Sequence, residues 1–255
     1  MHAQPRHENG GNTPEQGSKK GRLWTVGLRI WWHRLVSPDH LLLLASAVQF
    51  ALFVPLAWWA RKHPHPPVEL GVTHILQQKH STWLRSTSTA LSTITGSAVL
   101  LNVLVVPTAA VLWRRRLRLE AIMTMGISWT CTLVRIGIQW VINRPRPHPL
   151  LVRISHDKKT KSFPSGHVSS SVVFWGWVVA LGIMLRKGMS GWQRALVGTP
   201  ALFVAVVGPS RVYLGDHWTT DVLGGYLFGG GWLGLSLWLY LALRNRKVLA
   251  QTEDF

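Results

Sequence analysis

The sequence has few of the residues on which disulfide-bonded and metal-dependent proteins rely. It contains one cysteine, Cys131, so an intrachain disulfide and a thiolate-bound metal site are both excluded. Asp and Glu together number 10 among 255 residues, against 28 Lys and Arg. Because hard metal ions need clustered carboxylates, and none are clustered here, the sequence predicts no metal ion and no cofactor.

The excess of positive charge does not indicate a nucleic-acid-binding protein. A formal net charge of +18 would favour that class in a soluble chain. Here 47% of the residues are hydrophobic, and they are grouped in long apolar runs that a water-soluble fold rarely needs. The sequence therefore predicts an all-α, polytopic membrane protein that contacts membrane lipids and has no nucleic-acid partner.

Six apolar segments are long enough to cross a bilayer, which takes roughly 20 residues at ~1.5 Å per residue. They cover residues 41–60, 91–113, 121–142, 168–185, 196–214 and 222–243. We expect a six-transmembrane helix bundle over residues 39–247, followed by a C-terminal tail at 248–255. In the last segment Gly225 and Gly229, and Gly230 and Gly234, form two small-xxx-small pairs, which permit close helix contact.

The first part of the chain is polar and basic. Residues 1–22 have no apolar run, so we interpret them as a disordered basic tail rather than a secretory signal. Residues 23–38 predict an amphipathic interfacial helix, because apolar residues recur there at helical spacing; a basic linker is the alternative. Six spans place both termini on one side, where the Lys and Arg residues are in excess and where the short cluster at 114–118 is a strong local anchor. Since basic loops stay cytoplasmic, we expect cytoplasmic termini.

Two polar segments, before the fourth span, carry groups suited to an anion. Residues 143–149 hold Arg144 and Arg146 on a stretch that three prolines stiffen. Residues 163–168 include Ser165, Gly166 and His167, and their turn would open a helix whose N–H groups attract anions. The alternatives are a basic surface loop for the first segment and an ordinary helix cap for the second.

A third polar segment, residues 210–221, pairs an imidazole with a carboxylate. His217 and Asp221 are four residues apart, so on a helix they share a face. The carboxylate would fix the imidazole tautomer and leave the other ring nitrogen free to attack, and Arg211 supplies a planar cation that suits phosphate oxygens. A structural His–Asp pair is the alternative. All three segments fall on the extracytoplasmic face, where they predict an anion site with a nucleophile and an acid.

These motifs resemble those of the membrane-bound type 2 phosphatidic acid phosphatases, lipid phosphatases in the wider group that includes vanadium haloperoxidases. The family pattern is Lys-x6-Arg-Pro, then Pro-Ser-Gly-His, then Ser-Arg-x5-His-x3-Asp. The chain matches it at Arg146-Pro147, at Pro164 to His167, and at Ser210, Arg211, His217 and Asp221. The resemblance implies an integral membrane enzyme that hydrolyses a lipid phosphate or diphosphate without a metal ion.

The resemblance also implies a role for each matching residue. His217 would form a phosphohistidine, Asp221 would hold its ring, and His167 would protonate the leaving oxygen and then activate water. Arg146, Arg211, Ser165 and the Gly166 N–H would bind the phosphoryl oxygens. Undecaprenyl diphosphate, phosphatidic acid and phosphatidylglycerol phosphate all fit as substrates, and an outward-facing site in a plasma (inner) membrane fits the recycling of a carrier lipid.

One position departs from the family pattern. The expected Lys, seven residues before Arg146, is Gln139, which can donate a hydrogen bond to phosphate but carries no charge. Arg135 lies one helical turn deeper on the same face. We therefore assign Gln139 provisionally to the phosphate and expect Arg135 to supply the missing charge; pairing of Arg135 elsewhere in the bundle is the alternative.

Two other functions remain open from the sequence. A non-catalytic lipid-phosphate binding or transport protein is favoured by the missing Lys. A serine hydrolase would use Ser165 as its nucleophile, with a His–Asp pair behind it. The usual marker of that class, Gly-x-Ser-x-Gly at a strand-to-helix turn, is absent.

Overall fold

The computed structural model describes residues 38–79, 81–96, 98–155, 160–185 and 191–253. The chain divides into two compact units, residues 1–41 and 42–255, and the site belongs to the second. The tail expected at 1–22 and the helix expected at 23–38 lie outside the described residues, apart from residue 38.

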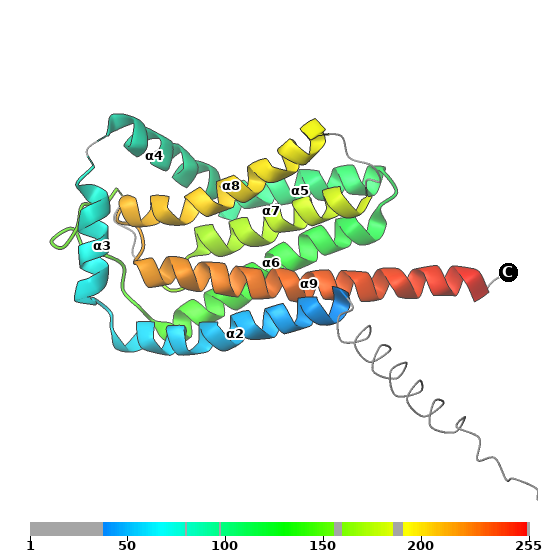
Figure 1. Cartoon of the computed structure of the whole chain (residues 1–255), viewed down its shortest axis with the longest axis horizontal. Coiled ribbons are helices and arrows are strands. Elements are labelled where there is room, and N and C mark those ends of the chain that lie inside the picture. The colour runs from blue at the N-terminus through cyan, green and yellow to red at the C-terminus, as the bar shows by residue number, and fades with distance from the viewer. Residues whose placement is uncertain (1–37, 80, 97, 156–159, 186–190, 254–255) are drawn as a thin grey trace, which may run out of the picture. The chain divides into compact units, whose positions relative to one another are not determined.

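The described residues form helices and no strands, which confirms the all-α prediction for this part of the chain. The helices are α2 (Pro38–Lys62), α3 (Pro67–Gln77), α4 (Thr82–Gly96), α5 (Ala98–Arg114), α6 (Arg118–Ile142), α7 (Gly166–Leu185), α8 (Gly191–Tyr213) and α9 (Thr219–Glu253) (Figure 1). α9 continues to Glu253, past residue 247, where the sequence predicts a tail, because no glycine or proline interrupts these helix-forming residues.

Within the described part of the chain, four helices are long and apolar enough to cross a membrane. They contain the stretches His40–Lys62, Arg118–Ile142, Gly166–Leu185 and Thr219–Arg246, which agree with four of the expected spans. The expected span at 91–113 instead falls on two helices: α4, rich in Ser and Thr and ending at Gly96, and α5, with a shorter apolar stretch. The expected span at 196–214 falls on α8, which contains Pro200 and Pro209. An integral membrane protein is thus supported, whereas a count of six spans is not confirmed.

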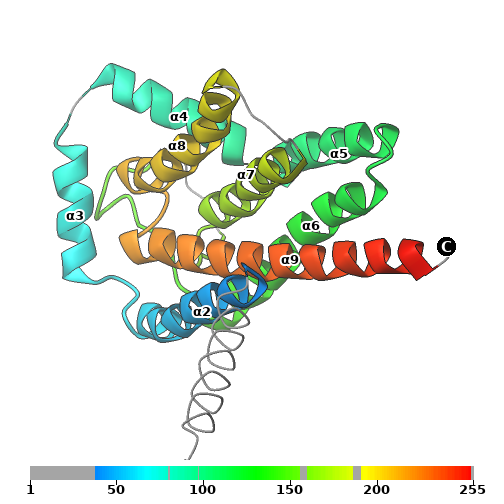
Figure 2. The ribbon, with the colours of Figure 1, turned by 45° about the vertical axis from the view of Figure 1, so that its right-hand side comes forward.

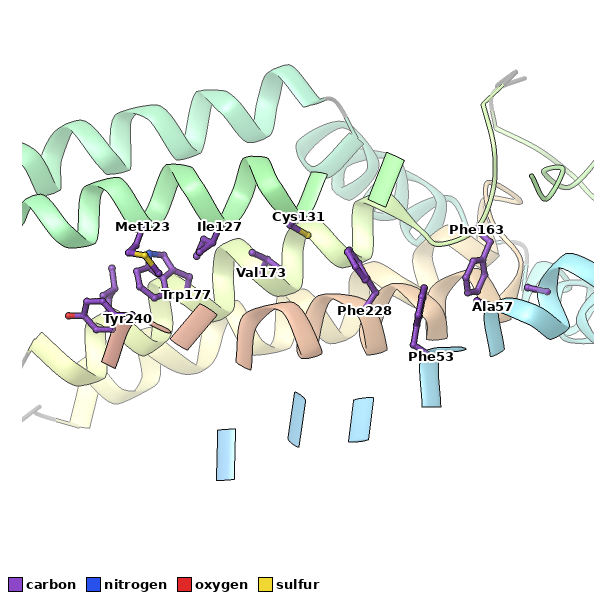
Figure 3. Close-up of a cluster of buried hydrophobic side chains, with 12 residues drawn as sticks. Phe53, Ala57, Met123, Ile127, Cys131, Phe163, Val173, Trp177, Phe228 and Tyr240 are labelled. Carbon is purple, nitrogen blue, oxygen red and sulfur yellow. The ribbon is translucent and has the colours of Figure 1, made fainter. Parts of the chain in front are cut away.

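α7 is the central helix of the larger unit and packs against α6, α8 and α9 (Figures 1 and 2). A second set of contacts joins α2 to α9 through aromatic rings. Phe53 lies between Phe163 and Phe228, with ring centroids 5.5 and 5.7 Å away. Figure 3 shows this row of rings continuing towards Trp177 and Tyr240 in the same buried cluster.

The two glycine pairs of α9 lie where other helices approach closely, as the sequence predicts. A Cβ atom on Gly229 would lie 3.0 Å from the Cα atom of Ser169 in α7. One on Gly234 would lie 2.3 Å from the Oγ atom of Ser46 in α2. Hydrogen at these positions therefore lets α9 contact α7 on one side and α2 on the other.

Four chain segments meet at one end of the bundle, where α6 and α8 end and α7 and α9 begin (Figure 1). α6 ends at Asn143, whose φ of 54° is left-handed, a conformation that asparagine tolerates. α3 contacts α8 and α9 across this end, and its buried residues are polar: Glu69, Thr73 and Gln77. The side chains that α3 buries against this end of the bundle are therefore polar.

The turn between α8 and α9 requires glycine. Gly215 has a φ of +68°, and a Cβ atom there would lie 2.2 Å from the carbonyl oxygen of Arg153. We expect Gly215→Ala to lower the free energy of unfolding by about 1–3 kcal/mol, measured by thermal or denaturant unfolding in detergent. Gly126→Ala is the control, since nothing lies within 4 Å of a Cβ there. Equal stability of the two variants would contradict this account.

Candidate active site

The imidazole of His217 lies fully buried in the turn before α9. Its Nδ1 atom is 3.5 Å from Asp221 Oδ2, and its Nε2 atom is 3.2 Å from Arg146 Nη1. A guanidinium group only donates hydrogen bonds, so Nε2 accepts and the ring proton resides on Nδ1, facing the carboxylate. This is the tautomer that a histidine nucleophile needs, with the Nε2 lone pair directed away from Asp221.

Arg146 is fixed on both edges of its guanidinium group. Its Nη1 atom also donates to the carbonyl oxygen of Asp216 (2.6 Å), and its Nε atom donates to the Thr160 carbonyl and hydroxyl oxygens (both 3.1 Å). Burial lowers the pKa of Arg146 from its ordinary value, while Asp216 and Asp221 act in the opposite direction. Arginine nevertheless stays charged at neutral pH, so a permanent cation lies beside the Nε2 atom of His217.

The Pro-Ser-Gly-His turn opens α7 at Gly166, as the sequence predicts. The His167 ring lies edge-on to the His217 ring, with centroids 6.0 Å apart. The Ser165 N–H donates to the carbonyl oxygen of Asp221 (2.9 Å), which joins the start of α7 to α9. Ser165 Oγ is buried and has no hydrogen-bond partner in the described part of the chain. The first turn of α7 and this hydroxyl can therefore receive an anion.

A cavity of about 540 Å³ leads to these groups. Its polar end is formed by Arg146, Gly166 and His167, and from there it extends along α6 and α7 past Ser128 and Leu133. Its walls are Thr95, Asn102, Ser128, Trp129, Thr132, Leu133, Arg135, Ile136, Gln139, Arg146, Thr160, Gly166, His167 and Ser170. This size and shape suit a phosphate group with part of an attached lipid.

Gln139 and Arg135 both line the cavity but differ in what they contact. The Gln139 side chain accepts from Arg135 Nη1 (2.9 Å) and donates to the carbonyl oxygens of Pro164 (3.1 Å) and Lys161 (3.4 Å). Its amide is thus already engaged with the turn before α7. The Arg135 guanidinium lies against Gly166, where a Cβ atom would be 3.0 Å from its central carbon. Its Nε atom is buried without a hydrogen-bond partner among the described residues.

Arg211 lies behind the catalytic turn rather than in the wall of the cavity. It is fully buried, and it donates to the Ser92 hydroxyl and to the Ser88 carbonyl oxygen (2.9 Å), both in α4. Its Nη1 atom is 3.5 Å from Asp216 Oδ2. In this structure Arg211 therefore joins α4 to the turn that carries His217.

Three residues support Asp221. The sequence predicts no role for Ser162 and Glu69, and it groups Arg144 with the anion-binding residues, whereas in the structure Arg144 pairs with carboxylates. Arg144 Nη1 donates to Asp221 Oδ1 (2.8 Å), and the Ser162 hydroxyl donates to Oδ2. Glu69, from α3, bonds to Arg144 in turn. The sequence shows Arg144 only as part of a basic stretch, and the one hint of Glu69 is the scarcity of acids that could balance a buried arginine.

The site presents cationic and imidazole groups rather than a metal-binding set. Within the described ranges, no three His, Cys, Asp or Glu side chains gather closely enough to hold a metal ion. The groups around the cavity can instead bind an oxyanion, attack it from His217 and supply a proton from His167.

Comparisons with known proteins agree with this geometry. Residues 118–245 match the PAP2 superfamily. Phosphatidylglycerophosphatase B of Bacillus subtilis (strain 168) is 26% identical over 147 residues, 58% of this chain and 70% of that protein. The putative undecaprenyl-diphosphatase YbjG of Escherichia coli (strain K12) is 33% identical over 128 residues, 48% of this chain and 59% of that protein.

Two solved structures share the fold. A PAP2-type phosphatidylglycerolphosphate phosphatase from Bacillus subtilis superposes with a TM-score of 0.64 at 22% identity, covering 75% of this chain and 93% of that one. LpxE of Aquifex aeolicus gives a TM-score of 0.51 at 22% identity, covering 66% and 93%. The segment matched by the family is half of the chain and contains the second and third motifs and the Arg-Pro end of the first, so the chain belongs to the PAP2 superfamily and is a lipid phosphatase of the membrane.

Proposed function

We propose that this lipid phosphatase cleaves an amphipathic phosphate monoester or diphosphate through a phosphohistidine on His217. The observation that carries the proposal is the Nε2 atom of His217, which accepts from Arg146 while Nδ1 faces Asp221. The names of the two curated relatives, a phosphatidylglycerophosphatase and a putative undecaprenyl-diphosphatase, support lipid phosphates and diphosphates as the substrate class.

In the first step the Nε2 lone pair of His217 attacks phosphorus and the bond from phosphorus to the leaving oxygen breaks. His167, in its protonated form, gives its proton to that oxygen, so the lipid product leaves as an alcohol or a lipid phosphate. Asp221 stabilises the positive charge that develops on the His217 ring.

In the second step water attacks the phosphohistidine. His167, now neutral, takes a proton from this water while the phosphorus–nitrogen bond breaks. Inorganic phosphate leaves and the lone pair returns to His217. The same imidazole thus acts as acid and then as base, which its position across from the His217 ring allows.

The phosphoryl oxygens would occupy the space beside Arg146, Ser165 and the Gly166 N–H. Arg146 would exchange its contact with His217 for one with phosphate, and the hydroxyl of Ser165 would gain the partner it lacks among the described residues. Arg211 adds positive potential from behind the turn. Such donors stabilise charge that grows in the transition state.

Arg135 is proposed to supply the charge of the family lysine, with Gln139 holding it in place. We expect Arg135→Ala to lower kcat/KM for a lipid phosphate by about 10–100-fold, the worth of a charged hydrogen bond. Gln139→Lys in that background should restore much of the loss. Arg118→Ala, on the exposed start of the same helix, is the control. Full turnover by Arg135→Ala would refute the assignment.

The site is proposed to face the outside of the plasma (inner) membrane, with both termini cytoplasmic. Support comes from the basic cluster at 114–118, which lies at the end of α5 and favours the cytoplasmic side. Intact spheroplasts that release phosphate from an impermeant short-chain lipid phosphate would agree with this orientation. Release only after lysis would contradict it.

The decisive test is phosphate release by purified protein from phosphatidic acid, phosphatidylglycerol phosphate and undecaprenyl diphosphate. Activity on at least one lipid, with acid-labile phosphate trapped on His217, supports the proposal. Phosphate trapped on Ser165, or inhibition by serine-directed phosphonates but not by vanadate, would indicate a serine nucleophile. Binding of all three lipids without phosphate release would indicate a carrier.

A further inference from the structure

A buried chain of charges runs from α3 to the catalytic pair. The Glu69 carboxylate accepts from Arg144 Nη2 through Oε2 (2.5 Å) and from the Thr220 N–H through Oε1 (2.6 Å). Arg144 donates through Nη1 to Asp221 Oδ1 (2.8 Å) and to Thr220 Oγ1 (2.6 Å). Glu69 and Arg144 are almost wholly buried, so neither charge is compensated by bulk water.

The two terminal nitrogens of the Arg144 guanidinium each bond to a different carboxylate. Nη1 faces Asp221 and Nη2 faces Glu69, and Nη2 also donates to the carbonyl oxygen of His63 (3.1 Å). Removing one partner of a buried ion pair leaves an uncompensated charge, which is strongly destabilising. The position of Asp221 therefore depends on Glu69, which is 75 positions away from Arg144 in the sequence. Because Asp221 faces the His217 ring, the position of that ring depends on Glu69 as well.

α3 is held in place near both of its ends by buried polar side chains, Glu69 near the start of the helix and Gln77 at its last residue. At its second end Gln77 donates to the carbonyl oxygens of Arg153 (2.7 Å) and Tyr213 (3.0 Å), and it accepts from the Arg153 N–H (3.1 Å). Glu69 therefore belongs to a helix that is hydrogen-bonded to the loop before α7 and to the end of α8. α3 lies outside residues 118–245, which carry the family match.

We propose that Glu69 is a positioning residue of the phosphatase, acting through Arg144 on Asp221 and His217. The inference rests on the proposed role of His217 as nucleophile. Glu69 balances the Arg144 charge and caps the first turn of α9 at Thr220, and these two contacts keep the Asp221 carboxylate turned towards the imidazole. Glu69 is not among the residues that form the cavity walls, so we expect it to affect the chemical step and not the binding of the lipid.

The test is Glu69→Gln, which keeps the shape of the side chain and removes its charge. We expect kcat for a lipid phosphate to fall by about 10–100-fold, the cost of a nucleophile displaced by a fraction of an ångström, with KM nearly unchanged. Glu120→Gln is the matched control. Glu120 is also buried and accepts a hydrogen bond from Tyr240 Oη (2.8 Å). It lies at the start of α6, whereas Arg144 and the catalytic pair lie near the end of that helix. The Glu120→Gln variant should retain the wild-type kcat.

A double-mutant cycle separates positioning from general loss of structure. In an Asp221→Asn background Glu69→Gln should cost little further activity, because both changes act on the same ring. A fully additive loss would overturn the proposal. So would a fall in the apparent kcat that disappears once activity is expressed per amount of folded protein. So would wild-type kcat in Glu69→Gln. If that variant does not accumulate in membranes, Arg144→Lys takes its place, since a lysine cannot bridge two carboxylates in a planar fork.

Failure of the positioning role of Glu69 can be distinguished from failure of the proposed nucleophile role of His217. If His217→Ala retains phosphohistidine formation or turnover, the nucleophile assignment is wrong whatever Glu69 does. If His217→Ala is inactive and Glu69→Gln is fully active, only the positioning role is wrong.

Discussion

The His217→Ala variant is expected to reach the membrane normally and to release no phosphate from any lipid phosphate above the uncatalysed level. Alanine removes the Nε2 atom that we propose attacks phosphorus, and with it the proposed phosphohistidine. Loss of a nucleophile commonly costs on the order of 10⁶-fold in kcat. The measurement is phosphate release from a lipid phosphate by purified protein, together with trapping of labelled phosphate on the protein.

The control for this variant is His148→Ala, which removes an exposed imidazole from the neighbouring loop. That change should leave both phosphate release and trapping at the wild-type level. Residual trapping in His217→Ala would show that another residue accepts the phosphoryl group.

The second large effect is expected for His167→Asn. Without a proton donor the lipid must leave as an alkoxide, and water must attack without a base, so turnover should fall by about 10²–10⁴-fold. The first step should suffer much less with p-nitrophenyl phosphate, whose leaving group needs no proton. The phosphohistidine is then expected to accumulate on His217, and rapid-quench trapping will measure it.

Two results would contradict the assignment of His167. One is an equal loss in the rate of phosphohistidine formation with the lipid and the nitrophenyl substrate, which would mean that His167 does not act on the leaving oxygen. The other is a phosphohistidine that turns over at the wild-type rate, which would mean that it does not activate water.

The sequence was sufficient to predict which segments meet, because short motifs and spans are local features. The start of α7 at Gly166 follows from the Pro-Ser-Gly-His turn, and the spans place that turn beside the segment that carries His217. The sequence did not predict the division of residues 91–113 into two helices. Hydropathy averages over that stretch and does not show that Ser92 is buried and accepts a hydrogen bond from Arg211.

The contacts around Asp221 could not be predicted because they join distant parts of the chain. Glu69 and Arg144 are 75 residues apart, and no local pattern relates them. The departure at Gln139 is different in kind. The sequence identified both Gln139 and Arg135 as candidates, and only the structure shows that the Gln139 amide bonds to Arg135 and to the carbonyl oxygen of Pro164.

The position of α3 and α4 has a consequence for engineering chimeric phosphatases. The family segment, residues 118–245, carries Arg144 and Arg211, but the acid and the serines that hold them come from α3 and α4. A graft of that segment alone would carry two buried guanidinium groups without the acceptors that α3 and α4 supply to them. Exchange of substrate preference between relatives therefore needs a crossover point before Pro67, so that the supporting helices travel with the motifs.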